Sequence, residues 1–333
     1  MIVDLHHHWM PRRHYEELER YLGPEFRVER HGERAYVFRG EEQYFMPTPT
    51  YFHLSQQIAD MDAAGVDMAV LHVGLWQDWN TSVTFAREIN EELAAVQQQY
   101  PHRFVGLVHP PVHDPEAGAA EVERGIRELG LRGVALNAHF RGLALDHRHF
   151  WPIFAAADRL DVPIVVHPAS VPPHTEWMAD YQLSNGLGRA LDLTVVTVRL
   201  FYSGVFEAFP RLRFSMSHLG GAFFALKNRV APQFFARTLP APGKRAELPA
   251  ADFDRDRSRI YFDTAPALWS SDELILAAKT VGAEQIVFGS DYPIGPRWMQ
   301  DAHERLRSLR PEVGLDPHRL GANAERLFGR PLR

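Results

Sequence analysis

The sequence contains no cysteine among its 333 residues. Disulfide bonds, thiolate nucleophiles and cysteine-ligated metals are therefore excluded, and any metal ion must be held by histidine and carboxylate side chains. Long apolar runs are also absent, because none approaches the roughly 18 residues that a membrane-spanning helix requires. The N-terminus enters an apolar run directly, without a basic segment followed by an apolar signal segment. We therefore expect a cytoplasmic protein with no membrane partner.

Basic residues are too few to suggest a nucleic-acid partner. The chain has 36 lysines and arginines against 42 aspartates and glutamates, for a formal net charge of -6. No stripe of basic residues interleaved with aromatic residues is found, so binding of nucleic acid is not expected. With 45% hydrophobic residues the chain can bury a large core, and we expect residues 1–333 to form a single globular domain.

Short apolar runs recur along the sequence and are separated by segments with helical periodicity. The eight runs are Ile2–Leu5, Met68–Val73, Phe104–Val108, Gly133–Leu136, Pro163–Val166, Leu212–Met216, Ile260–Phe262 and Ile286–Phe288. Between them, Pro115–Leu129 and Trp151–Leu160 carry apolar residues at the three- or four-residue spacing of an amphipathic helix. Eight strands that alternate with helices predict an α/β fold, the (β/α)8 TIM barrel, whose active site lies at the carboxyl ends of the strands.

Some segments are longer than a minimal connection between a strand and a helix. They are Pro11–Thr50, Ser170–Arg199 and Ala225–Arg259. The first contains the turn sequence His31-Gly32, which suggests a hairpin. Long loops at the catalytic face of a barrel usually shape a pocket or a lid, so we assign residues 11–50 as a lid insertion after the first strand. A structural or dimer-forming role for these segments is the alternative.

His6 and His8 lie at the end of the first predicted strand. Alternate side chains of a strand point to the same face, so these two imidazoles can bind one cation at the mouth of a barrel. His167 and Asp291 follow the fifth and eighth strands, which places them at the same end of the barrel. Three imidazoles and one carboxylate suit a divalent metal ion, Zn2+ most readily, with Mn2+ or Fe2+ as alternatives. A tag remnant or a chance cluster of polar residues is the competing interpretation of the first motif.

His218 follows the sixth strand and is assigned as a catalytic acid or base rather than as a further ligand. A metal-bound imidazole cannot exchange a proton near neutral pH, whereas an imidazole beside the metal can. Asp291 can contact both the metal and a bound water, so it receives a catalytic role as well. A core histidine and an ordinary turn are the alternatives for these two residues. The fourth strand, Gly133–Leu136 followed by Asn137, has no lysine that could bridge two ions, so we expect one ion.

Longer motifs surround these residues. They are His6-x-His8, Val165-Val166-His167-Pro168, Ser217-His218-Leu219-Gly220-Gly221-Ala222-Phe223 and Gly289-Ser290-Asp291-Tyr292-Pro293. Together they resemble the amidohydrolase superfamily, specifically its aminocarboxymuconate semialdehyde decarboxylase-like branch. The resemblance extends over almost the whole chain, through segments such as Phe104–Leu107 and Ser203–Pro210. It implies that His6, His8, His167 and Asp291 hold the metal and that His218 is the catalytic acid or base.

Two arginines extend the resemblance. Arg39 looks like the lid residue that binds a substrate carboxylate in the name-giving decarboxylase, and Arg229 looks like a second such residue, contributed there by a neighbouring subunit. The resemblance thus implies a homodimer and a small-molecule carboxylate substrate held by guanidinium groups. Exposed surface arginines are the alternative. Where that decarboxylase has Trp-Asp after the fifth-strand His-Pro, this chain has Ala169-Ser170, so the pocket wall differs.

The motifs favour a metal-dependent carboxy-lyase, a non-oxidative decarboxylase of a small unsaturated or aromatic carboxylic acid. The alternatives on the same site are a hydrolase of an amide, lactone or ester and a hydratase of a conjugated acid. A metal-binding barrel without catalytic activity is a third hypothesis, in which His218 and Asp291 would have no role. The product distinguishes these activities, because each one forms a different product: carbon dioxide, an opened ring or a hydrated double bond.

Overall fold

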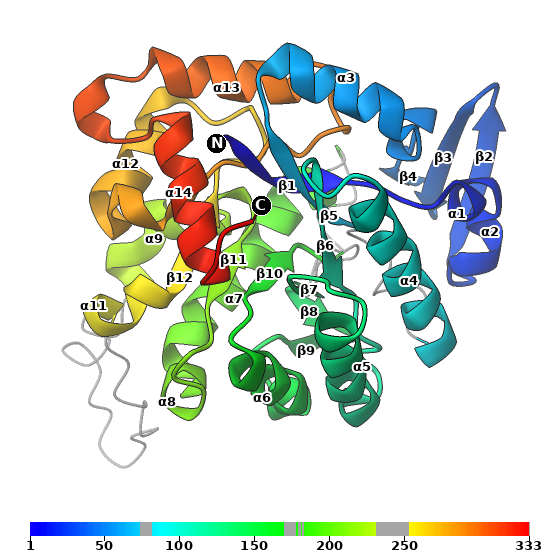
Figure 1. The fold of residues 1–333 in the computed structure, drawn as a ribbon, viewed down its shortest axis with the longest axis horizontal. Helices are drawn as coiled ribbons and strands as arrows, with labels where there is room; N and C mark the ends of the chain where they lie inside the picture. Colours follow the sequence, from blue (N-terminus) through cyan, green and yellow to red (C-terminus); the bar gives the residue numbers. More distant parts are fainter. Residues whose placement is uncertain (74–81, 170–177, 179–180, 182, 231–252, 333) are drawn as a thin grey trace.

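The eight expected strands form one parallel sheet in the computed structural model (Figure 1). The structure describes residues 1–73, 82–169, 178, 181, 183–230 and 253–332. In sheet order the strands are β1 (Val3–His8), β5 (Met68–His72), β6 (Phe104–Val108), β7 (Gly133–Asn137), β10 (Ile164–His167), β11 (Phe214–Met216), β12 (Ile260–Asp263) and β13 (Ile286–Val287). The predicted strands are confirmed. Only β1 differs much in length, because it continues past Leu5 through His8.

Hydrogen bonds between β1 and the end of β13 bring the edges of this sheet together. Leu5 N donates to Phe288 O over 2.8 Å, and His8 N donates to Tyr292 O over 2.8 Å. The first strand is thus joined to the last, and the predicted (β/α)8 barrel is confirmed.

Helices connect the strands and surround the barrel (Figure 1). They are α3 (Leu54–Ala64), α4 (Val83–Gln99), α5 (Pro115–Arg127), α6 (Trp151–Leu160), α7 (Arg189–Tyr202), α8 (Val205–Ala208), α9 (Phe223–Val230), α11 (Phe253–Asp256), α12 (Ser271–Val281), α13 (Trp298–Ser308) and α14 (Pro317–Phe328). α5 and α6 confirm the two helices predicted from periodicity. The Asp114 side chain caps α5 by accepting from Ala117 N over 3.0 Å. The π-helical turn Ser184–Gly188 and most of α7 fall in Ser170–Arg199, which was predicted to be a long connection.

The interior of the barrel is a packed core that ends below the histidines. Inward-facing strand residues such as Leu5 and Val70 pack together with Leu327 and Phe328 of α14. The opposite faces of the strands pack against the surrounding helices. α14 closes the end of the barrel where the strands begin, so the opposite end is left for a functional site (Figure 1).

A β-bulge in β1 determines which of its side chains face the barrel mouth. The pairing of β1 with β5 changes register between Asp4 and His7. Leu5 faces the interior core, and strict alternation would direct His7 to the same side. The bulge shifts the alternation by one residue, so His6 and His8 point into the mouth instead.

The segment 11–50 folds into two short helices and a small antiparallel sheet beside the barrel (Figure 1). These elements are α1 (Arg12–Glu16), α2 (Leu18–Tyr21), β2 (Phe26–His31), β3 (Arg34–Arg39) and β4 (Glu42–Phe45). β2 pairs with β3 up to His31 and Arg34, which confirms the hairpin expected at this turn. β4 is joined to the turn before α7, because Asn185 Nδ2 donates to Gln43 O over 3.0 Å. A second hairpin, β8 (His139–Phe140) and β9 (Leu143–Ala144), follows β7.

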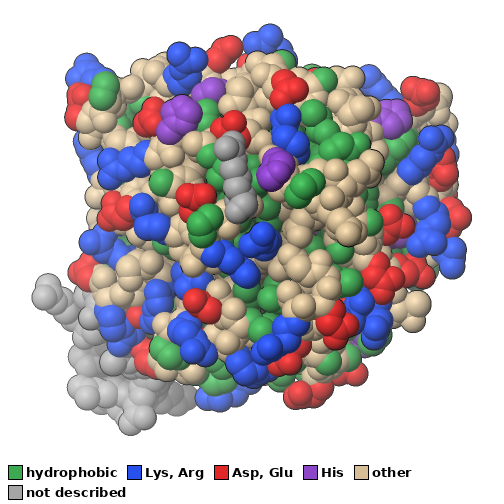
Figure 2. Space-filling view, in the orientation of Figure 1, with side chains coloured by type: hydrophobic (Ala, Val, Ile, Leu, Met, Phe, Trp, Pro, Cys, Tyr) green, Lys and Arg blue, Asp and Glu red, His purple; other side chains and the backbone are tan. Residues whose placement is uncertain are grey.

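The surface carries charges of both signs. On the face seen in Figure 2, acidic and basic side chains are interspersed. No helix within the described ranges combines the length and the apolar composition needed to cross a bilayer.

The Asp4 carboxylate connects β1 to the segment after β13. It accepts hydrogen bonds from Ser290 Oγ at 2.6 Å, from Ser290 N at 3.0 Å and from His6 N at 3.1 Å. It also lies 3.2 Å from His7 Nδ1. Asp4 has no exposed surface, so water cannot replace these contacts.

We expect Asp4→Ala to lower the free energy of unfolding by roughly 3 kcal/mol or more, because several buried donors lose their acceptor at once. Chemical denaturation measures the change. The matched control is Asp254→Asn, whose side chain is 82% exposed, and it should shift the free energy of unfolding by less than about 0.5 kcal/mol. A loss in Asp4→Ala no larger than that of the control would contradict this account.

Candidate active site

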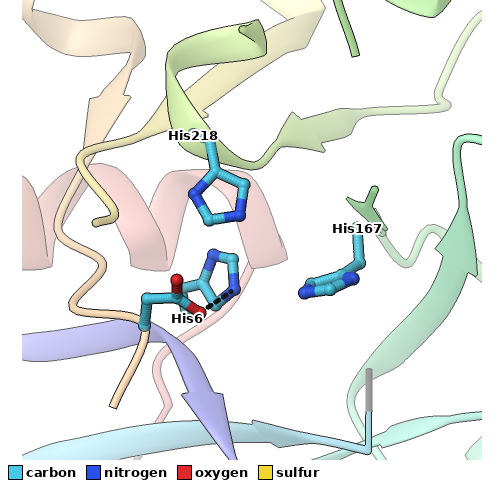
Figure 3. Close-up of side chains that lie close together, drawn as sticks. His6, His167 and His218 are labelled. Carbon is cyan, nitrogen blue, oxygen red and sulfur yellow. Dashed lines mark ion pairs between the residues drawn. The ribbon is translucent and has the colours of Figure 1, made fainter. Parts of the chain in front are cut away.

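Side chains from four strand ends meet at the mouth of the barrel. His6 lies on β1, His167 ends β10, His218 follows β11, and Asp291 follows β13. One ligand atom of each lies within 4.8 Å of the others. Figure 3 shows His6, His167 and His218 pointing toward a common region. The residues that the sequence analysis selected from separate strands therefore form one cluster.

His8 contacts this cluster through Asp291. One carboxylate oxygen, Asp291 Oδ1, lies 3.0 Å from His8 Nε2 and 3.2 Å from His6 Nε2. The set of mutually close ligand atoms contains His218 rather than His8, and a second such set joins His8 and His6 to His72. Geometry thus leaves two candidates, His8 and His218, for the same place in a metal site.

Two of these residues adopt a left-handed backbone conformation. φ is 51° at His218 and 63° at Asp291, values that favour glycine. Hydrogen bonds stabilise both conformations, because His218 N donates to Asp263 Oδ1 over 2.9 Å and Asp291 N donates to His6 O over 2.9 Å. Such conformations are typical of functional sites, where the surrounding structure fixes a side chain in a required direction.

Hydrogen bonds orient two of the imidazoles for metal binding. His167 Nδ1 donates to the carbonyl oxygen of Pro168 over 2.8 Å, and His6 Nδ1 lies 2.9 Å from Asp263 Oδ2. In each ring the second nitrogen, Nε2, is then the one that faces the cluster. A carbonyl or carboxylate on the outer nitrogen is the usual arrangement behind a metal-binding histidine.

The charges of the cluster fit a cation. Burial lowers the pKa of His6, but Asp263 and Asp291 outweigh it and raise this pKa to about 10. Burial lowers the pKa values of His8 and His167, which keeps their lone pairs free at neutral pH. Burial alone would raise the pKa of Asp291, yet the neighbouring imidazoles hold it well below its usual value. Neutral imidazoles, an ionised carboxylate and a place that favours positive charge are the donor set of a divalent metal ion.

His218 is also neutral at physiological pH. Burial is the main cause that lowers its pKa, to about 4. Its Nδ1 atom is buried and accepts or donates no hydrogen bond within the part of the chain that the structure describes. The ring can therefore accept a proton, either as a base or as part of a proton relay.

The sequence analysis missed two residues of the cluster. Asp263 ends β12 and touches both His6 and the His218 amide. His72 ends β5, and its ring centroid lies 4.6 Å from that of His8 and 5.2 Å from that of His167. Both residues lie at strand ends, so the rule that selected Asp291 could have selected them too.

The two arginines predicted to bind substrate lie on the surface of the chain. Arg39 is exposed at the end of β3, and Arg229 is exposed near the end of α9. Neither lines the cavity above the cluster. Binding of a substrate carboxylate by these two arginines would require that they reach a cavity outside this chain, such as that of a second subunit. Their role stays a prediction.

A cavity of about 620 Å³ opens beside His218 and Asp291. Its described lining comes from β4 and the residue after it, from the start of α7 and from the segments that follow β11, β12 and β13. The lining residues include Tyr44, Phe45, Met46, Asn185, Arg189, His218, Trp269, Asp291, Ile294 and Trp298. The wall is mainly apolar and aromatic with a few polar groups, as in many pockets for small organic ligands.

Comparisons with known proteins identify relatives of this chain. The 2-amino-3-carboxymuconate-6-semialdehyde decarboxylase of Dictyostelium discoideum is 25% identical over 242 residues, which cover 71% of this chain and 66% of that protein, just under two thirds of its length. The 2-keto-4-carboxy-3-hexenedioate hydratase of a Sphingobium species is 27% identical over 321 residues, covering 87% of this chain and 83% of that protein.

Solved structures show the same fold. A 5-carboxyvanillate decarboxylase from Novosphingobium aromaticivorans, solved with bound manganese, superposes with a TM-score of 0.81. The superposition covers 99% of this chain and 97% of that chain, at 22% sequence identity. The sequence profile of the amidohydrolase family matches residues 3–330, nearly the full length. The chain therefore belongs to the amidohydrolase family, as its strand-end motifs predicted.

Proposed function

We propose that this protein is a metal-dependent non-oxidative decarboxylase of a small aromatic or unsaturated carboxylic acid. The observation that carries the proposal is the convergence of His6, His167, His218 and Asp291 at the barrel mouth, where His218 and Asp291 also line a cavity with aromatic walls. Decarboxylases of such acids among the relatives support it.

We assign one divalent ion to His6, His8, His167 and Asp291. Zn2+ is the first choice because imidazole nitrogens dominate the set, and Mn2+ is supported by the manganese in the solved 5-carboxyvanillate decarboxylase. Fe2+ is the remaining alternative. When bound, the ion would act as a Lewis acid that draws electron density from a neighbouring substrate oxygen.

Loss of carbon dioxide leaves an electron pair on carbon, and that carbon must then take up a proton. His218 lies beside the proposed ligands and is unprotonated at neutral pH. Its lone pair can accept one proton from the solvent and pass it to the carbon where negative charge develops, so that the carboxylate and this proton give the product and carbon dioxide. Asp263 holds the His218 backbone in place and so fixes the direction of this transfer.

The aromatic walls of the cavity have a second role in the proposed reaction. Trp269 is fixed by donation from Nε1 to Ala265 O over 2.6 Å, and Trp298 lies on the same cavity wall. Flat apolar side chains bind an aromatic or conjugated substrate and exclude water from its reacting carbon.

Several finer assignments belong to the same proposal. Residues 11–50 would act as a lid of a single domain, 1–333, and Arg39 would bind the substrate carboxylate from it. The protein would form homodimers in the cytoplasm, with Arg229 acting in the neighbouring site. Phe234 and Phe235, in the long segment Ala225–Arg259, are proposed for the dimer contact, and they lie outside the described residues.

A hydratase is the second candidate. It is favoured by the Sphingobium hydratase, whose alignment covers 87% of this chain. The same cluster could hold a water for addition to a conjugated double bond, and a hydrolase would use such a water on an amide, lactone or ester.

Product analysis tests the proposed activity. The metal-loaded enzyme should release carbon dioxide from at least one member of a panel of hydroxybenzoic, benzenedicarboxylic and unsaturated dicarboxylic acids, and His218→Ala should not. Carbon dioxide is measured by a coupled assay, and organic products by mass spectrometry. Gain of water or an opened ring without carbon dioxide would contradict decarboxylation and support a hydratase or hydrolase.

Metal analysis of variants tests the roles of the histidines. Elemental analysis should find close to one divalent ion per chain, and His167→Ala or His8→Ala should lose metal and activity together, because each removes a proposed ligand. His218→Ala should keep its metal while turnover falls roughly a hundredfold or more.

The same measurements can contradict these assignments. Metal loss in His218→Ala equal to that in His167→Ala would make His218 a ligand. Metal retention in His8→Ala would remove His8 from the set, and two ions per chain would contradict a mononuclear site.

A further inference from the structure

Arg189 is a cavity residue without a partner for its charge. It is the first residue of α7 and lines the cavity together with His218 and Asp291. No described carboxylate lies within ion-pair distance of it. Its Nε atom is buried and has no hydrogen-bond partner among the described residues. Only a long contact, 3.4 Å from NH2 to Tyr44 O, and the Tyr44 ring at 5.3 Å engage the guanidinium.

This arrangement points to a bound anion. A guanidinium stays charged at any physiological pH, and a buried donor without an acceptor destabilises the protein that carries it. A planar carboxylate satisfies two guanidinium donors at once. An anionic group of a ligand would supply the acceptor that the described residues do not provide for Arg189.

Neighbouring contacts fix Arg189 between the small sheet and the barrel. Asn185 Nδ2 donates to Gln43 O over 3.0 Å, and Ser184 Oγ donates to Glu42, so β4 is attached to the turn before α7. The described lining of the cavity has two carboxylates, Asp291 and Glu273. Glu273 accepts a hydrogen bond from Ser270 N over 2.7 Å in the cap of α12. Arg189 thus follows a turn that is attached to the small sheet, its side chain lines the cavity, and neither Glu273 nor Asp291 pairs with it at ion-pair distance.

The chemistry of decarboxylation determines which substrate group belongs there. A departing carboxylate loses its negative charge as carbon dioxide forms, so a cation bound to it would stabilise the substrate more than the transition state. An anionic group that stays on the product keeps its charge throughout. Binding of that second group positions the substrate without slowing the reaction.

We propose that Arg189 binds a carboxylate that remains on the product, so that the substrate is a dicarboxylic acid with one aromatic ring or a conjugated chain of similar size. The carbon that loses carbon dioxide would lie beside His218, and the retained carboxylate would face Arg189. The assignment rests on the proposed decarboxylation. It makes Arg189 a residue that determines specificity, in addition to the predicted Arg39 and Arg229.

Equilibrium binding tests this proposal independently of turnover. Isothermal titration calorimetry on the metal-loaded protein compares benzoate with phthalate, isophthalate and terephthalate, which vary the spacing of two carboxylates on one ring. The wild type should bind one dicarboxylate roughly ten- to a hundredfold more tightly than benzoate, the effect of a charged hydrogen-bonded pair. Arg189→Gln should abolish that advantage and leave the affinity for benzoate within about twofold.

Two further variants complete the design. Arg189→Lys should keep part of the advantage, because it retains the charge but not the two parallel donors. Arg199→Gln removes an exposed guanidinium from the same helix, where it pairs with Asp146 at 2.6 Å, and should keep the full advantage. Should Arg189→Gln fail to fold, as judged by circular dichroism, the partial loss in Arg189→Lys decides the test.

The outcomes separate this proposal from its alternatives. Equal weakening of benzoate and dicarboxylates in Arg189→Gln would mean that Arg189 only attaches the small sheet, and it would overturn the proposal. Equal affinity of the wild type for benzoate and all three dicarboxylates would overturn it as well. If the dicarboxylate advantage depends on Arg189 but no dicarboxylic acid releases carbon dioxide, the assignment of Arg189 stands and the proposed activity fails.

Discussion

The site depends on how the first strand meets the segment after the last one. The Asp4 carboxylate binds the Ser290 amide and hydroxyl, and the Asp291 amide donates to His6 O over 2.9 Å. These contacts set the distance between His6 and the Asp291 carboxylate. A bulge in β1 then directs two histidines of one strand to the barrel mouth, although Leu5 of the same strand belongs to the core. The contacts that close the barrel therefore also position the residues of the site.

The cluster buries several imidazoles and two carboxylates close together. Without a cation, the buried carboxylates lack a full counter-charge, and some imidazole nitrogens, such as His218 Nδ1, lack a partner among the described residues. Several imidazoles lie within van der Waals range, and burial favours their neutral forms. Asp263 and Asp291 instead favour a positive charge at His6. A proton on His6 supplies that positive charge only in part, because it occupies Nε2, the nitrogen atom that would bind a metal ion. A divalent ion shared among neutral imidazoles and a carboxylate satisfies all of these groups together.

The sequence predicts the barrel well because each strand is a short apolar run, and buried parallel strands have that pattern. It also predicts His6, His167, His218 and Asp291 as neighbours, since strand ends of a barrel converge. Other features of the site could not be predicted from the sequence. The bulge leaves no local signal in the sequence, and Arg189 lies at the start of a helix, where nothing marks it as a cavity residue. Which of His8 and His218 completes a metal site depends on interatomic distances that no motif encodes.

Anomalous diffraction from crystals of the metal-loaded protein tests the central claim most directly. The account predicts one peak between β1 and the segment after β13, with Nε2 of His6, His8 and His167 and an oxygen of Asp291 about 2.0–2.3 Å away. The His6 contact with Asp263 should persist behind it. A peak coordinated by His218 in place of His8, or one located away from these residues, would contradict the account.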